Sequence, residues 1–302
     1  MSRPRALLAW ALVVALLALA GCRPPPEPGP IHFEGRPAVG PGAEELVARL
    51  EGLLRGRSGR YGFVLEHLDR GERFALDDRR PFAAASTYKL ALAYEVLREA
   101  GLGQVRLDAP LRIGADDAVE PEPAGGLAVG QEVTVRQALE ASMGVSSNAA
   151  GHALLRLVGR GQLNRSLARL GLADTRVPPD TGPFAIWRRL VGPDVAMTTP
   201  GDMAQLLRLL ERGELLDRAG QAELRRLLRI PESLDPLANG LLPDAVVLAK
   251  VGNLEAASNV AGLVETAGGA LIVSIYSQDV DPDEARQLCG QLGRALYDFY
   301  TG

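Results

Sequence analysis

The pattern of apolar and polar positions predicts a helix and a hairpin near the front of the folded domain. Leucines and a valine at helical spacing favour a helix that begins near residues 41–43. Apolar runs at 61–68 and 73–76 are separated by the turn residues 69–71 and predict a β-hairpin. The stretch from about 86 to 230 is instead dominated by helical patterns rich in Leu, Ala and Arg, which predicts a block of helices.

Strand-like patterns return after Pro243 and predict the second half of a sheet. Three apolar runs begin at residues 245, 260 and 270, and a final helical pattern covers Pro282 to Tyr300. Strand signals at both ends of the domain indicate an α/β (α+β) fold, with one mainly antiparallel sheet flanked by helices. An all-helical subdomain is inserted between the two groups of strands, and we expect a site in the cleft where sheet and subdomain meet.

The first residues have the organisation of a bacterial lipoprotein signal peptide. Arg3 and Arg5 form a short basic region, and the apolar stretch 6–20 is shorter than the roughly 20 residues that a membrane-spanning helix needs. Its end, Leu-Ala-Gly-Cys22, resembles a lipobox, in which cleavage leaves a lipidated cysteine. We therefore expect residues 1–21 to be removed and Cys22 to anchor the protein to a membrane outside the cytoplasm, in the periplasm or at the cell surface. A plain secretory signal and an uncleaved anchor are the alternatives.

Residues 22–43 precede the predicted domain and are rich in proline. Seven prolines lie between positions 23 and 41, and the stretch has no apolar periodicity. This composition predicts an extended tether, which leaves residues 44–302 as the folded domain.

Charge and cysteine content limit the possible partners. Removal of residues 1–21 changes the formal net charge from −4 to −6, and no basic segment typical of nucleic-acid binding is present. With Cys22 acylated, no second cysteine remains to form a disulfide or a cysteine-based metal site with Cys289. The three histidines are widely scattered, so we predict no metal, no cofactor and no nucleic-acid partner. The expected partners are a small-molecule substrate and the membrane, and the protein is expected to be a monomer.

Lysine usage marks two positions as unusual. Of the 33 lysine and arginine residues, only Lys89 and Lys250 are lysines. Arginine stays protonated under nearly all conditions, whereas a desolvated lysine can release its proton. The two lysines are therefore candidates for roles that arginine cannot perform.

Lys89 lies three residues after Ser86 at the start of a predicted helix. Three residues is nearly one helical turn, so the hydroxyl and the amine share a face. The helix start also places backbone N–H groups and the positive end of the helix dipole near Ser86, where they favour a developing anion. A serine hydroxyl becomes a strong nucleophile when a base lies within hydrogen-bond reach. A helix N-cap is the other common role of a serine in this position.

Two further segments with polar residues at short spacing follow Ser86 and Lys89 along the chain. Ser146 and Asn148 offer a hydroxyl and an amide two residues apart, and residues 250–253 end a predicted strand with Lys-Val-Gly-Asn. Together, S-x-x-K, S-x-N and K-x-G resemble the motifs of the serine β-lactamase and penicillin-binding-protein superfamily. The class A branch is the most similar, because residues 197–207 resemble the segment that follows its omega loop. The resemblance covers roughly residues 44–302.

The resemblance implies a catalytic role for four side chains. Ser86 would form the acyl-enzyme, and Lys89 would take its proton. Ser146 would relay a proton to the leaving nitrogen, with electrostatic support from Lys250.

The resemblance also implies how the substrate is held. Asn148 would bind the amide carbonyl of the substrate. The backbone N–H groups of Ser86 and Asn253 would form the oxyanion hole, next to the close backbone approach that Gly252 permits.

Three departures from the family pattern change the expected activity. The middle residue of S-x-N is Ser147. Class A enzymes have Asp at this place, whereas S-S-N resembles penicillin-binding proteins, so acylation is not expected to suffer. Val251 replaces the Thr or Ser that helps bind the substrate carboxylate, and one such charged hydrogen bond is worth roughly 1.5–3 kcal/mol. Residues 141–210 contain no glutamate, although class A enzymes activate water for deacylation with a Glu in the omega loop. Asp180 is the only acid near that place, and its side chain is shorter.

These features predict a class A β-lactamase-like serine hydrolase that is acylated on Ser86 by β-lactams or related amides. Without a base to activate water, the acyl-enzyme is expected to persist. A D-alanyl-D-alanine carboxypeptidase or penicillin-binding protein, or another amidase or esterase, is the alternative within the same fold. A peptidoglycan-binding or sensor lipoprotein that releases no product is a different class, which the missing glutamate favours and the complete set of motif residues disfavours.

Overall fold

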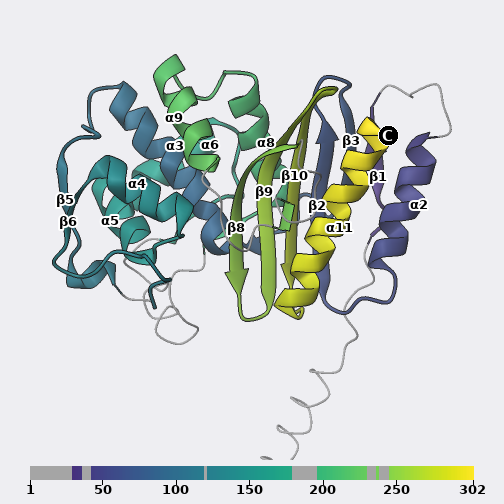
Figure 1. Cartoon of the computed structure of the whole chain (residues 1–302), viewed down its shortest axis with the longest axis horizontal. Coiled ribbons are helices and arrows are strands. Elements are labelled where there is room, and N and C mark those ends of the chain that lie inside the picture. Colours follow the sequence, from purple (N-terminus) through teal and green to yellow (C-terminus); the bar gives the residue numbers. More distant parts are fainter. Residues whose placement is uncertain (1–28, 36–41, 119–120, 179–195, 230–235, 238–244) are drawn as a thin grey trace, which may run out of the picture.

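A central sheet separates a block of helices from a pair of helices (Figure 1). The computed structural model describes residues 29–35, 42–118, 121–178, 196–229, 236–237 and 245–302. The predicted signal peptide, the lipidation site Cys22 and the acid Asp180 lie outside these ranges.

In the part of the chain that the structure describes, six strands form the central sheet, and every neighbouring pair is antiparallel. In spatial order they are β1 (His32–Glu34), β3 (Glu72–Leu76), β2 (Arg60–His67), β10 (Gly269–Gln278), β9 (Ala257–Thr266) and β8 (Val246–Leu254). Strand β2 from the front of the domain pairs with β10 from its end, so that Phe63 lies opposite Ile275. The prediction of one antiparallel sheet built from both chain ends is confirmed.

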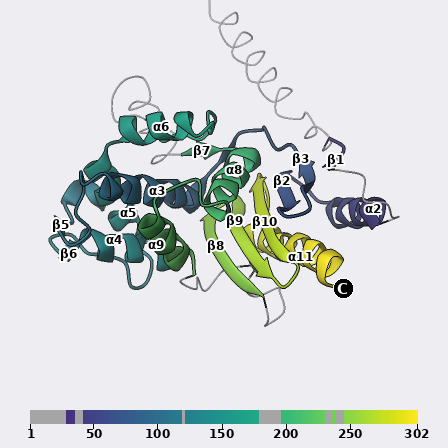
Figure 2. The same cartoon turned by 90° about the horizontal axis from the view of Figure 1, so that it is seen from above.

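Helices cover both faces of this sheet, which explains why its central strands are almost continuously apolar. Helices α2 (Gly42–Leu54) and α11 (Pro282–Thr301) lie on one face, and α8 (Pro200–Glu211) lies on the other (Figure 2). Nearly every residue of β2, β9 and β10 is buried. A sheet buried on both sides needs apolar side chains on both, so the strands do not alternate between apolar and polar residues.

Two hydrophobic cores fix the position of the sheet. Leu46 and Leu50 of α2 belong to one core with Leu288 and Leu292 of α11, and all four side chains are buried. The second core joins the opposite face to α8 and to the helical block. Burial of a leucine side chain contributes roughly 1.5–3 kcal/mol, so these cores hold sheet and block together firmly.

The inserted block is mainly helical, as predicted. Its helices are α3 (Tyr88–Gly101), α4 (Val135–Gly144), α5 (Asn148–Val158), α6 (Arg160–Arg169) and α9 (Arg218–Leu228). Helix α3 is buried along most of its length, as its run Leu-Ala-Leu-Ala-Tyr suggests, and it forms the centre of the block.

The block is not all-helical, however, and this part of the prediction is corrected. Two short antiparallel pairs occur within it or at its edge: β5 (Pro110–Arg112) with β6 (Glu132–Thr134), and β4 (Phe82–Ala83) with β7 (Met197–Thr198). It also contains the 3₁₀ turns η1 (Ala85–Thr87) and η2 (Ala115–Asp117). Strands of two or three residues are too short to show a periodicity, so the sequence pattern did not reveal them.

The predicted tether of residues 22–43 is also wrong for five of its residues, of which Gly42 and Ala43 begin α2. His32–Glu34 form β1, the edge strand that pairs with β3, and the ring of Phe33 packs on that of Phe74 with 4.9 Å between centroids. Among the residues that the structure describes, no helix combines the length and the apolar character needed to cross a membrane.

Candidate active site

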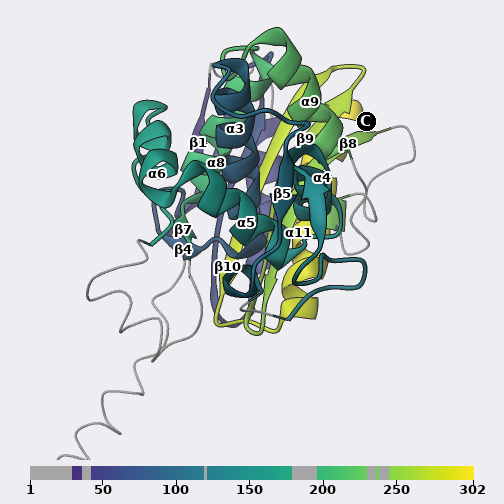
Figure 3. The same cartoon turned by 90° about the vertical axis from the view of Figure 1, so that its left-hand side faces the viewer.

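The three predicted motifs meet where β8 lies against the helical block. Figure 3 shows this block from its outer side, with α3, α4 and α5 in front of the sheet. Ser86 is in η1, Lys89 is in the first turn of α3, and Ser146 is in the turn between α4 and α5. Asn148 is the first residue of α5, and Lys250, Gly252 and Asn253 are on β8. Residues from three distant parts of the chain therefore form one cluster.

The hydroxyl of Ser146 lies between the two lysines of the chain. Lys89 Nζ donates to Ser146 Oγ at 3.3 Å, and Lys250 Nζ donates to the same oxygen at 3.2 Å. Both lysine side chains are almost completely buried, at 1% and 0% exposure. Polar groups that are desolvated in this way interact with a neighbouring hydroxyl more strongly than they would in water.

Lys89 also links the first motif to the second. Its Nζ donates to the backbone oxygen of Ser146 at 2.6 Å and to Oδ1 of Asn148 at 2.9 Å. Asn148 Nδ2 in turn donates to the backbone oxygen of Pro121 at 2.9 Å, which determines the orientation of the amide. The predicted substrate-binding amide is therefore held between a lysine and a backbone carbonyl.

Backbone strain marks the same two motifs. Among the described residues, four that are not glycine have a positive φ, and two of these are aspartates, which tolerate the left-handed region. The other two are Ala85 with φ 47° and Ser146 with φ 60°. Such conformations cost of order 1–3 kcal/mol each and persist only where the surroundings enforce them. No sequence signal indicated either position.

Buried hydrogen bonds hold the turn that carries Ser86. Thr87 Oγ1 donates to the backbone oxygen of Ala84 at 2.6 Å and accepts from the hydroxyl of Tyr276 at 2.9 Å. Asn259 Nδ2 donates to the backbone oxygen of Ala83 at 2.9 Å. Burial raises the pKa of the Tyr276 phenol, so this group stays protonated and remains a donor. The turn that carries Ser86 is thus fastened to strands β9 and β10.

Strand β8 passes very close to the backbone of Ser86, and Gly252 makes this possible. A Cβ at this position would lie 2.9 Å from the backbone oxygen of Ala84 and 3.0 Å from the backbone nitrogen of Ser86. Only glycine fits such an approach without displacing the turn. The next residue, Asn253, is exposed, and its Oδ1 accepts from Ser258 Oγ at 2.8 Å.

Val251 points away from this cluster. Successive side chains of a strand alternate between its faces, and Val251 lies on the face opposite Lys250. Its side chain is 2% exposed and belongs to the core under α2 and α11. The substitution of a hydroxyl-bearing residue by Val251 therefore also serves the packing behind the sheet.

Two residues near the site, Gly151 and Glu122, were not identified from the sequence, nor was the capping role of Ser147. Gly151 lies below Lys89, where a Cβ would be 3.1 Å from Lys89 Cε. A glycine inside a helical pattern was the available signal for it. Ser147 is the N-cap of α5, and its hydroxyl donates to Glu122 at 2.7 Å. No local pattern links Glu122 to this helix, because the two lie 25 residues apart.

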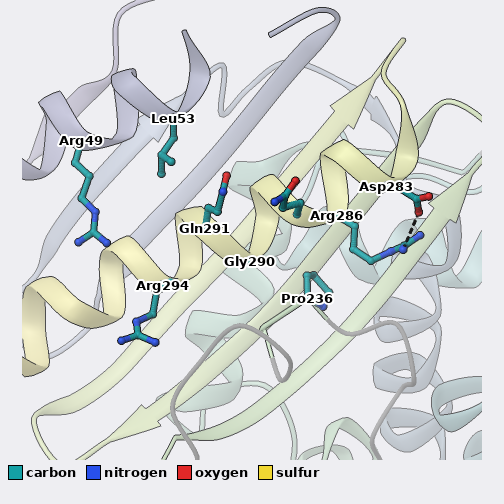
Figure 4. Close-up of a pocket in the computed structure, with 9 residues that line it drawn as sticks. Arg49, Leu53, Pro236, Asp283, Arg286, Gly290, Gln291 and Arg294 are labelled. Atoms are coloured by element: carbon teal, nitrogen blue, oxygen red, sulfur yellow. Dashed lines mark ion pairs between the residues drawn. The ribbon is translucent and has the colours of Figure 1, made fainter. Parts of the chain in front are cut away.

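A separate groove lies on the far side of the sheet, between α2 and α11 (Figure 4). It has a volume of about 530 Å³, and its arginines face acids: Arg286 pairs with Asp283, and Arg49 and Arg294 pair with Asp298. The groove contributes no residue to the cluster around Ser86. Within the described ranges, no group of three or more His, Cys, Asp or Glu side chains is arranged to hold a metal ion.

Comparison with known proteins assigns the family. Residues 45–300 match the beta-lactamase enzyme family, and the chain belongs to it. Beta-lactamase L2 of Stenotrophomonas maltophilia is 28% identical over 257 residues, which cover 82% of each chain. The crystal structure of a beta-lactamase from Xanthomonas campestris superposes with a TM-score of 0.75 at 28% identity, covering 86% of this chain and 98% of that one. The structure of PBP-A has the same fold, with a TM-score of 0.75 at 22% identity and coverage of 87% and 97%.

These findings confirm the predicted family and fold. The chain is a β-lactamase-like protein of the serine hydrolase kind, with a mixed α/β architecture in which helices flank an antiparallel sheet.

Proposed function

We propose that the protein is an acyl-transferring serine hydrolase that β-lactams or related amides acylate on Ser86. The convergence of Lys89 and Lys250 on the hydroxyl of Ser146 is the observation that carries this proposal. A purely structural site gains nothing from burying two amines around one hydroxyl, because burial of charged groups is costly. The same arrangement is suited to moving a proton between a nucleophile and a leaving group.

The chemistry follows from these positions. Ser86 Oγ attacks the amide carbonyl carbon, and its proton passes to Lys89, whose buried amine beside a second cation is a suitable base. The developing oxyanion accepts hydrogen bonds from backbone N–H groups at the approach of Ser86 and Asn253. The C–N bond then breaks, and the proton reaches the leaving nitrogen through Ser146 with Lys250 beside it. The product of this half-reaction is an ester on Ser86.

The outer edge of β8 is a suitable place for the substrate. Within the described ranges, β8 is the last strand of the sheet. An extended amide or peptide can pair with such an edge. The cluster around Ser86 lies beside this edge, which supports a peptide-like or β-lactam substrate.

Release of the acyl group is expected to be slow. Residues 141–210 contain no glutamate, and Asp180, the nearest acid in sequence to the predicted place of the base, lies outside the described residues. PBP-A offers a parallel, because a mutant of that protein is known as an acyl-enzyme complex with penicillin G. A penicillin-binding protein, a carboxypeptidase or a sensor that keeps its acyl group is therefore the second candidate function.

Time-resolved mass spectrometry of the intact protein tests the proposal. After addition of a penicillin, we expect an adduct of one penicillin mass that forms on the wild type and is absent from Ser86→Ala. A lasting adduct identifies a penicillin-binding protein or sensor, and a transient adduct identifies a β-lactamase. An adduct that is equally strong on Ser86→Ala, or no adduct on the wild type, would refute acylation of Ser86 by this substrate class.

We also propose that the protein is a lipoprotein anchored through Cys22 outside the cytoplasm. The lipobox-like end of the apolar segment supports this location, and the proline-rich stretch that follows can serve as a spacer. Cell fractionation tests it: the wild type should sediment with membranes, and Cys22→Ala should not. Retention of Cys22→Ala in the membrane fraction would contradict lipid anchoring.

A further inference from the structure

A loop between η2 and β6 holds the segment that carries Ser146 and Asn148. Glu122 lies in this loop, and both of its carboxylate oxygens face the start of α5. Oε2 accepts from Ser147 Oγ at 2.7 Å, and Oε1 accepts from the backbone nitrogen of Ala149 at 2.5 Å. These are charge-assisted hydrogen bonds, which are about twice as strong as neutral ones.

The neighbouring residue of the loop completes the contact. The backbone oxygen of Pro121 accepts from Asn148 Nδ2 at 2.9 Å, so Pro121 and Glu122 together hold three consecutive residues of the α5 start. Ser147 is fully buried, and its hydroxyl also accepts from the backbone nitrogen of Ala150 at 3.2 Å. The loop therefore acts as a clamp on both sides of Asn148.

The contacts of Pro121 and Glu122 with α5 hold a strained backbone in place. Ser146 directly precedes these residues and has the strained φ of 60°. Its hydroxyl must stay between Lys89 and Lys250, and strain of this kind relaxes unless the adjoining backbone is fixed. A carboxylate at the N-terminus of α5 also interacts favourably with the helix dipole.

We propose that Glu122 is a positioning residue for the acylation of Ser86. From a separate loop, Glu122 supplies the carboxylate that S-D-N motifs carry in their middle residue. In this chain that middle residue is the neutral Ser147. Glu122 acts through the backbone of α5 and is not the base that activates water, because both of its oxygens already accept hydrogen bonds from α5. The inference rests on the proposed function, since the step that it supports is acylation.

A charge-relocation experiment tests this role. Glu122→Gln should slow acylation by a penicillin about tenfold, because two charge-assisted bonds weaken. Ser147→Asp alone should also slow it, since two carboxylates then face each other. In the double variant Glu122→Gln/Ser147→Asp the carboxylate stands at the N-cap, where Asp is as favourable as Ser, and the rate should return to within about threefold of wild type. Glu132→Gln, which removes the same charge from an exposed position on β6, should leave the rate unchanged.

Hydrogen exchange separates the clamp from the chemistry. Amides of residues 145–150 should exchange faster in Glu122→Gln and regain protection in the double variant. If the wild type forms no adduct but exchange follows this pattern, the clamp stands and the proposed function fails. A Glu122→Gln variant with wild-type exchange, or one that loses thermal stability while acylating at the wild-type rate, would overturn the positioning role. The role would also be overturned if acylation of the double variant were slowed as much as the effects of the two single substitutions combined.

Discussion

At the scale of single residues, the site depends on side chains whose surroundings differ from what their neighbours in sequence suggest. Ser146 is one serine among several, yet the buried amines of two lysines face its hydroxyl. A glycine inside a helix lowers the stability of that helix, yet Gly151 leaves space for the side chain of Lys89. The burial of each group, more than its chemical type, determines what it can do.

Val251 is the residue where sequence and structure lead to a sharp prediction. A threonine there restores the hydroxyl of the K-T-G pattern, but this side chain points into the core and away from the lysine cluster, so we expect Val251→Thr to leave the acylation rate with carboxylate-bearing β-lactams unchanged. Because the position is 2% exposed and faces an apolar core, the substitution should lower the free energy of unfolding by about 1–3 kcal/mol. Adduct formation followed by mass spectrometry and urea unfolding measure the two quantities.

Val264→Thr is the matched control for this change. Val264 is equally buried, faces the same core and lies farther along β9 from the site. It should lose stability without a gain in acylation. A faster acylation by Val251→Thr would show instead that a hydroxyl at this position reaches the substrate carboxylate.

At the scale of elements, the contact between β8 and η1 determines the geometry around Ser86. Edge strands are usually places where unwanted pairing must be prevented. In this protein the edge strand instead ends beside the first turn of a buried helix, and Gly252 lets the two backbones approach. The strand and the turn come from segments more than 160 residues apart, roughly the separation of Ser86 and Gly252 in the chain.

Gly252→Ala tests this contact directly. The added methyl group would lie 2.9 Å from the backbone oxygen of Ala84, so the turn or the strand must shift. We expect a loss of about 1–3 kcal/mol in the free energy of unfolding and at least about a tenfold slower acylation. Gly268→Ala, where the nearest atom is 3.7 Å away, should change neither quantity. Wild-type acylation by Gly252→Ala would contradict a tight approach at this point.

At the scale of the whole molecule, the sheet has a buried titratable group far from the lysine cluster. His67 is fully buried at the end of β2, and its ring meets that of Tyr300 from α11 edge to face at 4.4 Å. Its Nε2 has no hydrogen-bond partner in the described structure, and Nδ1 accepts from the backbone nitrogen of Arg70 at 3.4 Å. Burial, followed by the charge of Arg70, lowers the pKa of this imidazole.

This lowered pKa predicts how stability depends on pH. In the unfolded chain His67 binds a proton as the pH falls through about 6.5, whereas in the folded protein it stays neutral to lower pH. The unfolded state then holds more protons, so the free energy of unfolding should decrease as the pH falls from 7 towards 5. Urea unfolding at several pH values should show a weaker decrease for His67→Phe, which retains a ring against Tyr300.

The control for this prediction is His32→Gln. His32 is exposed on β1, so its replacement should leave the pH dependence of the free energy of unfolding as in the wild type. A His67→Phe variant with the full wild-type dependence would show that other groups cause it.

The sequence by itself determined the kind of fold and the chemistry of the candidate site. Helical and strand periodicities arise from neighbouring residues, so they indicated α2, the hairpin of β2 and β3, the three C-terminal strands and α11. The motif residues were recognisable because a serine, a lysine and an asparagine occur at short spacings, and because the chain has only two lysines. The missing omega-loop glutamate is likewise a property of the sequence, and slow deacylation stays a prediction.

Only the tertiary structure decided how these parts meet. The pairing of β1 with β3, the two short strand pairs of the block and the contact of Glu122 with α5 join residues far apart in the chain, and no local pattern encodes them. The left-handed backbone of Ala85 and Ser146 also depends on packing, because neither residue favours it alone. Short-range periodicity determines which elements form, whereas burial against distant partners determines which side chains face the site.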